Sequence, residues 1–263
     1  MQEFRERYGP VAVVTGASSG IGQAFAEELA ERGFDLVLVA RRVDRLESLA
    51  ARLAEAHGIA AQVLPVDLAR ADAARTIIEA TADRDVGLVV SNAGFGMKGD
   101  HAGNDPAAMT EMLMVNCNVP MQLAHGFAPR LRARGQAGTG AGLILVSSIE
   151  GLMGCPYSTA YSASKALVNA LGEGLWAELR PDGVDVLTVC PGATESEAAG
   201  KQGIDIAKLR NVMPARDVAR AALDNLAEGP TFFPSAVYKA SFDQLLAMPR
   251  RDALAAMAKG MKG

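Results

Sequence analysis

Residues 11–22 read VAVVTGASSGIG and join a short apolar run to a glycine-rich turn. The continuous apolar run at 11–15 is typical of a strand buried on both faces of a parallel sheet. The glycines of the turn let the backbone bend sharply and approach a ligand closely. A helix beginning at Ile21 directs its free N–H groups and positive dipole end at the turn, so pyrophosphate is the ligand it fits. A tight connection without a ligand is the alternative, because the glycine spacing differs from GxGxxG.

The same alternation of strand and helix continues along the chain. Further apolar runs lie at 36–40, 62–65, 88–91, 143–147, 186–190 and, more weakly, 231–234. Segments with helical spacing lie at 21–32, 44–57, 69–82, 106–134, 159–179 and 215–228. Repeated alternation of this kind forms a doubly wound sheet with right-handed crossovers. We therefore expect a single Rossmann-like α/β domain over residues 1–263.

Composition excludes several classes of protein. Of the 263 residues 49% are apolar and 21% charged, which predicts a large core and no extensive disorder. The net charge of −4 predicts no nucleic-acid partner. Cys117, Cys155 and Cys190 lack paired spacing and are interpreted as free thiols, and the three scattered histidines suggest no metal site. Residues 1–8 lack a signal-peptide apolar stretch and no run approaches the ~20 residues of a membrane span, so we expect a soluble cytoplasmic protein.

Two segments have no place in the alternation. Residues 193–212 are long and polar, with Gly200 and Gly203, and are expected to form a mobile lid. The tail at about 235–263 contains Met248, Met257 and Met261 and has an amphipathic pattern. It either covers a pocket, joins an interface or hangs free.

The end of the second strand indicates which dinucleotide binds. Enzymes that use NAD usually place Asp or Glu there to hold the ribose 2′-hydroxyl. This sequence has Arg41 and Arg42 after Ala40. Guanidinium groups suit a 2′-phosphate, which predicts NADP(H) in preference to NAD(H). The alternative is that one or both arginines face solvent at the start of a helix.

Residues after the third and fourth strands are further candidates for cofactor binding. Asp67 can accept a hydrogen bond from the adenine amine, with Leu68 beside it, although Asp is also common in turns and at helix N-termini. Asn92, Ala93 and Gly94 follow the fourth strand. Small residues there leave room for a cofactor, and the Asn amide can brace the sheet. Strand-end turns also favour Asn and Gly.

Tyr161 and Lys165 are four residues apart in a predicted helix, so both side chains lie on one face. A tyrosine hydroxyl titrates near ~10, and a nearby ammonium lowers that pKa by stabilising the phenolate. Such a tyrosine can protonate a carbonyl oxygen or accept a proton from an alcohol. The pair alone is common on helices, so its interpretation depends on the surrounding residues.

Two polar residues supply that context. Ser148 ends the fifth strand, 13 residues before Tyr161, and its hydroxyl can hydrogen-bond a substrate oxygen. Asn116 lies in a mostly apolar helical stretch and needs polar partners if it is buried. It could hold a water that relays protons to Lys165.

Together these motifs resemble the short-chain dehydrogenase/reductase family in order and spacing. The resemblance covers residues 11–233 and rests on 15–22, 92–94, Asn116, Ser148, 161–165 and Pro191-Gly192. It implies a seven-stranded parallel sheet and a catalytic tetrad of Asn116, Ser148, Tyr161 and Lys165. Tyr161 would be the acid and base, Ser148 would polarise the carbonyl, Lys165 would hold the nicotinamide ribose and Asn116 would anchor the relay water. Ser148 is chosen over Ser147 because its spacing to Tyr161 matches the family.

The resemblance also implies that residues after the sixth strand cover the nicotinamide. Thr194 would bond the carboxamide through its backbone, and Ser196 stands where the family often has Thr. An ordinary Pro-Gly turn is the alternative. The residues expected to contact the cofactor are Gly16, Ser18, Ser19, Gly20, Ile21, Gly22, Arg41, Arg42, Asp67, Leu68, Asn92, Ala93, Gly94, Tyr161, Lys165, Pro191, Gly192, Thr194 and Ser196.

The expected function is NADP(H)-dependent carbonyl reduction or alcohol oxidation. Candidate pocket residues include Phe95, Glu150, Leu152, Met153 and Cys155, and this largely apolar set suits a hydrophobic ketone, a 3-oxoacyl thioester or a steroid-like alcohol. The rival functions are a non-catalytic NADP(H) sensor or interaction protein on the same scaffold, and a sugar-nucleotide epimerase or dehydratase. The family resemblance further implies a homodimer or homotetramer.

Overall fold

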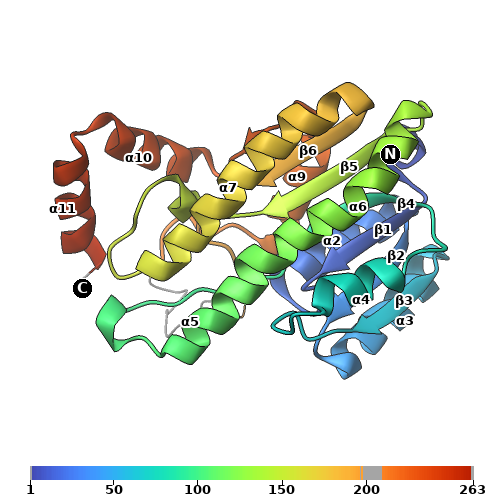
Figure 1. Cartoon of the computed structure of the whole chain (residues 1–263), viewed down its shortest axis with the longest axis horizontal. Helices are drawn as coiled ribbons and strands as arrows, with labels where there is room; N and C mark the ends of the chain where they lie inside the picture. The colour runs from blue at the N-terminus through green and yellow to red at the C-terminus, as the bar shows by residue number, and fades with distance from the viewer. Residues whose placement is uncertain (1, 196, 198–208, 262–263) are drawn as a thin grey trace.

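The computed structural model describes residues 2–195, 197 and 209–261 (Figure 1). Within them, seven parallel strands form one sheet in the order β3-β2-β1-β4-β5-β6-β7. The strands are β1 (Val11–Thr15), β2 (Asp35–Ala40), β3 (Ala61–Pro65), β4 (Val86–Ser91), β5 (Ala141–Val146), β6 (Val184–Val189) and β7 (Thr231–Phe232). The predicted Rossmann-like sheet is confirmed.

Helices cover both faces of the sheet. One face carries α2 (Gly20–Glu31), α3 (Val43–His57) and α9 (Ala215–Asp224), and the other carries α4 (Ala73–Glu79), α6 (Val119–Gln136) and α7 (Thr159–Leu179). A short α1 (Gln2–Tyr8) precedes the first strand. This two-sided cover explains the continuous apolar character of the strands, because both sets of alternating side chains are buried.

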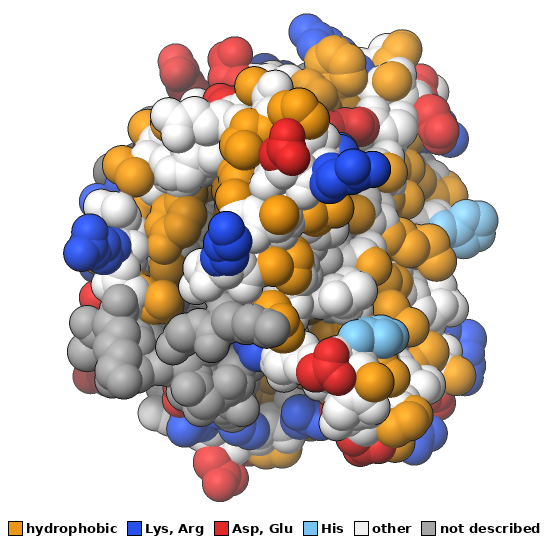
Figure 2. All heavy atoms as spheres, turned by 90° about the vertical axis from the view of Figure 1, so that its left-hand side faces the viewer, with side chains coloured by type: hydrophobic (Ala, Val, Ile, Leu, Met, Phe, Trp, Pro, Cys, Tyr) orange, Lys and Arg blue, Asp and Glu red, His pale blue; other side chains and the backbone are white. Residues whose placement is uncertain are grey.

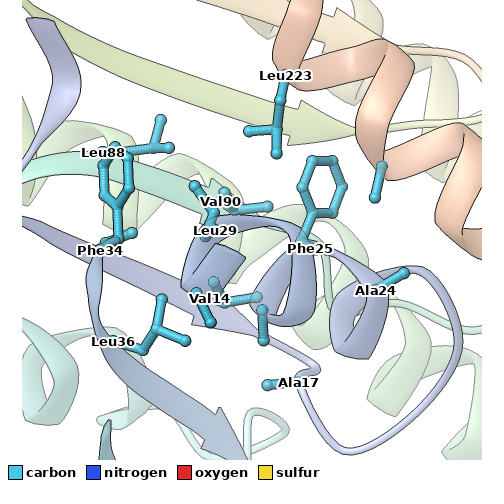
Figure 3. Packing of buried hydrophobic residues seen from close by; sticks show 14 of the residues in the cluster. Val14, Ala17, Ala24, Phe25, Leu29, Phe34, Leu36, Leu88, Val90 and Leu223 are labelled. Atoms are coloured by element: carbon cyan, nitrogen blue, oxygen red, sulfur yellow. The ribbon is translucent and has the colours of Figure 1, made fainter. Parts of the chain in front are cut away.

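The core divides into two clusters, one on each face of the sheet. Val14 belongs to the cluster under α2, whereas its neighbour Val13 belongs to the cluster on the opposite face. Phe25 of α2 points toward Leu223 of α9 across the first cluster (Figure 3), and both side chains are almost completely buried. Burial of a phenylalanine side chain contributes about 1.5–3 kcal/mol to stability. The packing of α2 on the sheet fixes the direction in which its N-terminus points.

Three predicted helices differ from the structure, and the one expected at 215–228 divides into α9 and a separate short 3-10 helix, η6 (Leu226–Glu228). The helix expected at 106–134 consists of α5 (Pro106–Leu113) and α6, joined by a π-helical turn, η2 (Met114–Asn118). The helix expected at 69–82 is shorter, because turns at 68–72 precede α4. Helical periodicity does not distinguish a π turn from an α-helix over so short a stretch.

The C-terminal tail forms α10 (Ala236–Ala247) and α11 (Arg250–Met261). Phe242 and Ala253 of these helices pack with Ile149 and Met153, on and beside the short helix η3 (Ile149–Leu152) that follows β5. The tail therefore lies beside the segment that follows Ser148 rather than hanging free. No helix among the described residues is long and apolar enough to cross a membrane.

Candidate active site

The candidate site lies at the carboxyl ends of the strands, which point to the left in Figure 1. β1 lies between β2 and β4, so the chain leaves β1 toward one edge of the sheet and later returns on its other side. Such a reversal of strand order opens a crevice for ligands. Figure 2 views this end of the molecule, where hydrophobic side chains lie between scattered acidic and basic ones.

The glycine-rich turn after β1 is packed against the end of β4. Gly16 has φ +70°, and a Cβ there would lie 2.8 Å from Asn92 Nδ2. Asn92 Nδ2 donates to the Thr15 carbonyl oxygen at 2.9 Å, which confirms that Asn92 braces the sheet. Gly16 is therefore required by the turn itself, whether or not a ligand approaches it.

The N-terminus of α2 fits an anionic group. Ser19 makes no side-chain hydrogen bond to the first turn of the helix, and that turn contains no acidic residue. The helix dipole and the exposed N–H groups there are left for a ligand. The hydroxyl oxygens of Ser18 and Ser19 instead accept hydrogen bonds from Arg42 Nη2 at 3.0 and 2.7 Å. Gly20, Ile21 and Gly22 form the start of this helix.

Arg41 and Arg42 have different surroundings. Arg42 lies on the glycine-rich turn and also pairs with Glu197 at 2.7 Å. Arg41 is 60% exposed and pairs with Glu111 at 3.2 Å. Each guanidinium has a carboxylate partner, and a 2′-phosphate would compete with those carboxylates.

The two candidate cofactor contacts after β3, Asp67 and Leu68, take part in the turn and in the core. Asp67 accepts a hydrogen bond from the Ala69 N–H at 3.2 Å, so it has the role in a turn that the sequence left open as the alternative. Its carboxylate lies 3.8 Å from Arg41. The Leu68 side chain is buried in the core, which leaves only its backbone for a ligand.

Ser147 and Ser148 make different contacts at the end of β5. The Ser148 hydroxyl lies beside the phenol of Tyr161, whose pKa it lowers, and accepts from the Glu150 N–H at 3.2 Å. The Ser147 hydroxyl instead donates to the Lys165 carbonyl oxygen at 2.9 Å. Ser148 is thus the serine beside Tyr161, and Ser147 fastens α7 to the sheet.

Burial changes the acidity of both groups on α7. Lys165 Nζ donates to the Val146 carbonyl oxygen at 2.9 Å, and burial lowers the pKa of this ammonium to about 8. The pKa of Tyr161 is raised by burial and by the carboxylate of Glu150, against the lowering effect of Ser148. The expected downward shift is therefore wrong for the chain by itself, because removal of the phenolate from water outweighs the favourable contacts.

Asn116 braces three segments from within the π turn. Its Nδ2 donates to the Phe95 carbonyl oxygen at 2.9 Å and to Ser164 Oγ at 3.0 Å, and its Oδ1 accepts from the Phe95 N–H at 3.0 Å. A Cβ on Gly94 would lie 3.0 Å from Asn116 Oδ1 and 3.1 Å from Lys165 Nζ. Gly94 therefore packs directly against Asn116 and Lys165, where a larger side chain would press on both.

The segment after β6 lies across the end of β5. The Pro191 carbonyl oxygen accepts from the Ile149 N–H at 3.0 Å, and Gly192 lies against the ring of Tyr238. Thr194 pairs with Met213 in an isolated bridge. Ser196 and residues 198–208 of the expected lid lie outside the described residues.

The sequence interpretation named Glu150 as a pocket candidate but missed its partner, Lys98. Lys98 Nζ donates to both carboxylate oxygens of Glu150, at 2.7 and 3.0 Å, and to Ser158 Oγ at 3.0 Å. The only available signal was that Lys98 is the first charged residue after Asp85. Glu111 and Glu197, the partners of the two arginines, were missed as well.

Comparisons with known proteins found similar sequences and folds over most of this chain. The family model described as "short chain dehydrogenase" matches residues 10–206. A 7beta-hydroxysteroid dehydrogenase of Clostridium sardiniense is 32% identical over 257 residues, with 97% of each chain covered. A solved short-chain dehydrogenase from Sphingobium yanoikuyae, in complex with NADPH, is 33% identical with a TM-score of 0.82, covering 94% of this chain and 96% of that one. The bulky-bulky ketone specific alcohol dehydrogenase from Comamonas testosteroni is 30% identical with a TM-score of 0.76, covering 95% and 94%.

Proposed function

This chain belongs to the short-chain dehydrogenase/reductase family, and on that premise we propose that it reduces a bulky hydrophobic ketone with NADPH, or oxidises the matching alcohol with NADP⁺, using Tyr161 as acid and base. The observation that carries the proposal is that the Ser148 hydroxyl and the buried ammonium of Lys165 both lie beside Tyr161. A hydroxyl donor, a phenol and an ammonium in this order can hold a carbonyl oxygen and deliver a proton to it.

Each residue of the tetrad has a distinct part in this proposal. The bound nicotinamide supplies or accepts the hydride. Ser148 donates to the substrate oxygen, which orients the carbonyl and stabilises the charge that develops on it. Tyr161 gives its proton to that oxygen during reduction and recovers it during oxidation. Lys165 supports the phenolate and contacts the ribose, while Asn116 holds the loop after β4 against α7.

The preference for NADP(H) is part of the proposal. Arg41 and Arg42 directly follow β2, where enzymes that use NAD usually have an acidic residue, and a 2′-phosphate bound to them would replace their carboxylate partners Glu111 and Glu197. The relative from Sphingobium yanoikuyae was solved with NADPH. Two guanidiniums near one phosphate group would supply charge-assisted hydrogen bonds that NADH cannot accept.

The substrate side is predominantly apolar. Leu152, Met153 and Cys155 follow Ser148 in the chain and form one apolar cluster with the C-terminal helices. Burial raises the pKa of the Cys155 thiol to about 12, so it stays protonated and serves as a small apolar residue. A steroid-like or otherwise bulky ketone suits this lining, in line with the two relatives described by such substrates.

A screen of purified protein tests the function. Hydroxysteroids and their ketones, bulky aromatic ketones and 3-oxoacyl thioesters are offered with NADPH and NADH, or with the oxidised forms, while the absorbance of the reduced nicotinamide is followed. We expect turnover of at least one bulky carbonyl compound, faster with NADPH. Tight NADPH binding without turnover of any substrate would contradict the proposal and favour a sensor.

We also propose a homodimer through α6 and α7. A groove between these helices is lined by Met121, His125, Leu171 and Leu175, and Met121 is 41% exposed. A second copy would bury these apolar side chains. Light scattering on the purified chain tests this, and a monomer at micromolar concentration would contradict it.

A further inference from the structure

Lys98, Glu150 and Ser158 join two loops beside the candidate catalytic tyrosine. Lys98 belongs to the loop after β4, Glu150 lies two residues after Ser148, and Ser158 is the residue before α7. The ammonium of Lys98 bonds to both of the others. The Lys98 and Glu150 side chains are 22% and 24% exposed, so water screens their charges only in part.

The same two loops are joined by their backbones. The Gly99 N–H donates to the Tyr157 carbonyl oxygen at 2.8 Å, and Tyr157 has φ 58°. A tyrosine in the left-handed region needs support from its surroundings. Ser158, with its hydroxyl on Lys98, follows this residue and precedes Tyr161 by less than one helical turn. The contacts of Lys98 thus reach the start of the helix that carries the catalytic phenol.

We propose that Lys98 and Glu150 form a tuning pair that sets the electrostatic environment of the Tyr161 phenol, with Lys98 acting through Glu150 as a positioning residue. The inference rests on the proposed function, because it assumes that Tyr161 exchanges the proton. It adds a specific role for two residues that do not touch the reacting atoms.

The charged and titratable groups around Tyr161 come from several segments. Lys165 faces it from α7, Glu150 from η3, and the thiols of Cys155 and Cys190 from the loops beside them. Among these groups Glu150 is the carboxylate, and it raises the pKa of the phenol. Lys98 holds both oxygens of that carboxylate, so it partly balances the negative charge that the phenol experiences.

The two members of the pair should therefore act in opposite directions. Glu150→Gln removes a negative charge, which makes the phenolate easier to form. Lys98→Met leaves the Glu150 carboxylate unbalanced, which makes the phenolate harder to form. The midpoint of the phenol titration should move by about 0.5–1 pH unit in each direction, because the charges of Lys98 and Glu150 are only partly screened. The double variant should return close to the parent.

The test is the pH profile of kcat for alcohol oxidation with NADP⁺, measured for the parent, both single variants and the double variant. We expect the midpoint to fall in Glu150→Gln and to rise in Lys98→Met, whereas Lys98→Arg keeps the parent midpoint. Arg75→Met and Glu79→Gln remove the charges of an exposed pair on α4 and should leave the profile unchanged. Midpoints that move in the same direction in both single variants, or that do not move, would overturn the tuning pair.

A second readout does not depend on turnover. The absorbance of the Tyr161 phenolate in the NADP⁺ complex is obtained as the difference between each protein and its Tyr161→Phe counterpart during a pH titration. Its midpoint should move as the kinetic midpoint does. If Tyr161→Phe turns over at the parent rate, the proposed function fails. If it is inactive but the Lys98 and Glu150 variants keep the parent midpoint in both readouts, only the tuning pair fails.

Discussion

Lys165 Nζ lies 5.8 Å from the centroid of the Tyr161 ring and has the Val146 carbonyl oxygen as a hydrogen-bond acceptor at 2.9 Å. The acceptor is the last residue of β5, so the lysine is anchored to the sheet while it faces the tyrosine on its own helix. Burial opposes the charge on both side chains. The phenol stays protonated at neutral pH, whereas the buried ammonium of Lys165 makes the free energy of folding less favourable there.

Tyr161→Phe tests the proton donor. The ring and its packing are retained, so folding and NADPH affinity should stay close to the parent. Turnover should fall by at least ~10²-fold, the lower range for general acid–base catalysis. Steady-state kinetics with the substrate from the screen, together with a fluorescence titration of NADPH, measures both quantities. Loss of NADPH binding together with turnover would mean that the hydroxyl serves the cofactor rather than the proton.

Lys165→Met should change stability in a pH-dependent way. Burial lowers the pKa of Lys165 from 10.5 to about 8, so between these values the unfolded chain binds more protons than the folded chain. The parent is destabilised in full below about pH 8, and this destabilisation disappears as the pH rises toward 10.5. Its size is on the order of 3 kcal/mol, at about 1.4 kcal/mol per pK unit.

The variant lacks this contribution, and the loss of its hydrogen bond to Val146 adds an amount that does not depend on pH. The advantage of Lys165→Met over the parent should therefore be greatest below about pH 8 and decline above it. Urea unfolding of the cofactor-free proteins at several pH values measures the difference. Lys239→Met, which removes an exposed lysine paired with Asp243, is the control. A difference that does not change with pH would contradict the prediction.

Arg41→Ala and Arg42→Ala separate two contributions to coenzyme binding. Each should weaken NADPH by roughly tenfold to a hundredfold, since a hydrogen bond to a charged group contributes about 1.5–3 kcal/mol. Arg42 also holds Ser18 and Ser19, so its loss should weaken NADH to a smaller degree, whereas Arg41→Ala should leave NADH unchanged. Calorimetric titration of both coenzymes measures this. Equal losses for NADPH and NADH in Arg41→Ala would contradict a phosphate contact.

Glu197→Gln tests competition for the arginines. The Glu197 carboxylate pairs with Arg42 and Arg45, and their hydrogen bonds lower its pKa to about 2, so it is ionised at every working pH. A 2′-phosphate on Arg42 must displace or share this carboxylate. NADPH affinity should therefore rise several-fold in the variant while NADH affinity is unchanged. An equal change for both coenzymes would show that Glu197 acts on another part of the site.

Gly16→Ala should destabilise the fold rather than only weaken the coenzyme. The left-handed backbone alone costs a non-glycine residue about 1–2 kcal/mol. The new Cβ would also press on Asn92 and Ala93, at 2.8 and 3.0 Å. Gly58→Ala is a matched control, because Gly58 has φ +68° and no atom within 4 Å of the added Cβ. Thermal unfolding should show a larger loss of stability for Gly16→Ala than for Gly58→Ala. Equal losses of stability would show that the close contacts with Asn92 and Ala93 add nothing to the cost.

Local sequence patterns were sufficient to predict the strands and helices. The strand at 11–15 and the helix at 159–179 have the predicted bounds, because continuous apolar runs and helical spacing depend on residues that are neighbours in the chain. The candidate residues at strand ends also lie together, since parallel strands bring their carboxyl ends to one edge. The separation of 13 residues likewise predicted that Ser148, rather than Ser147, lies beside Tyr161.

Only the tertiary structure decided which partners these residues have. The Lys98–Glu150 and Arg42–Glu197 pairs join residues 52 and 155 positions apart, and no local pattern encodes such distances. The raised pKa of Tyr161 follows from how much water the surrounding segments exclude, which is a property of packing. The sequence by itself thus determined the strands, the helices and the chemical groups at the strand ends, whereas long-range packing decided their charges, partners and acidity.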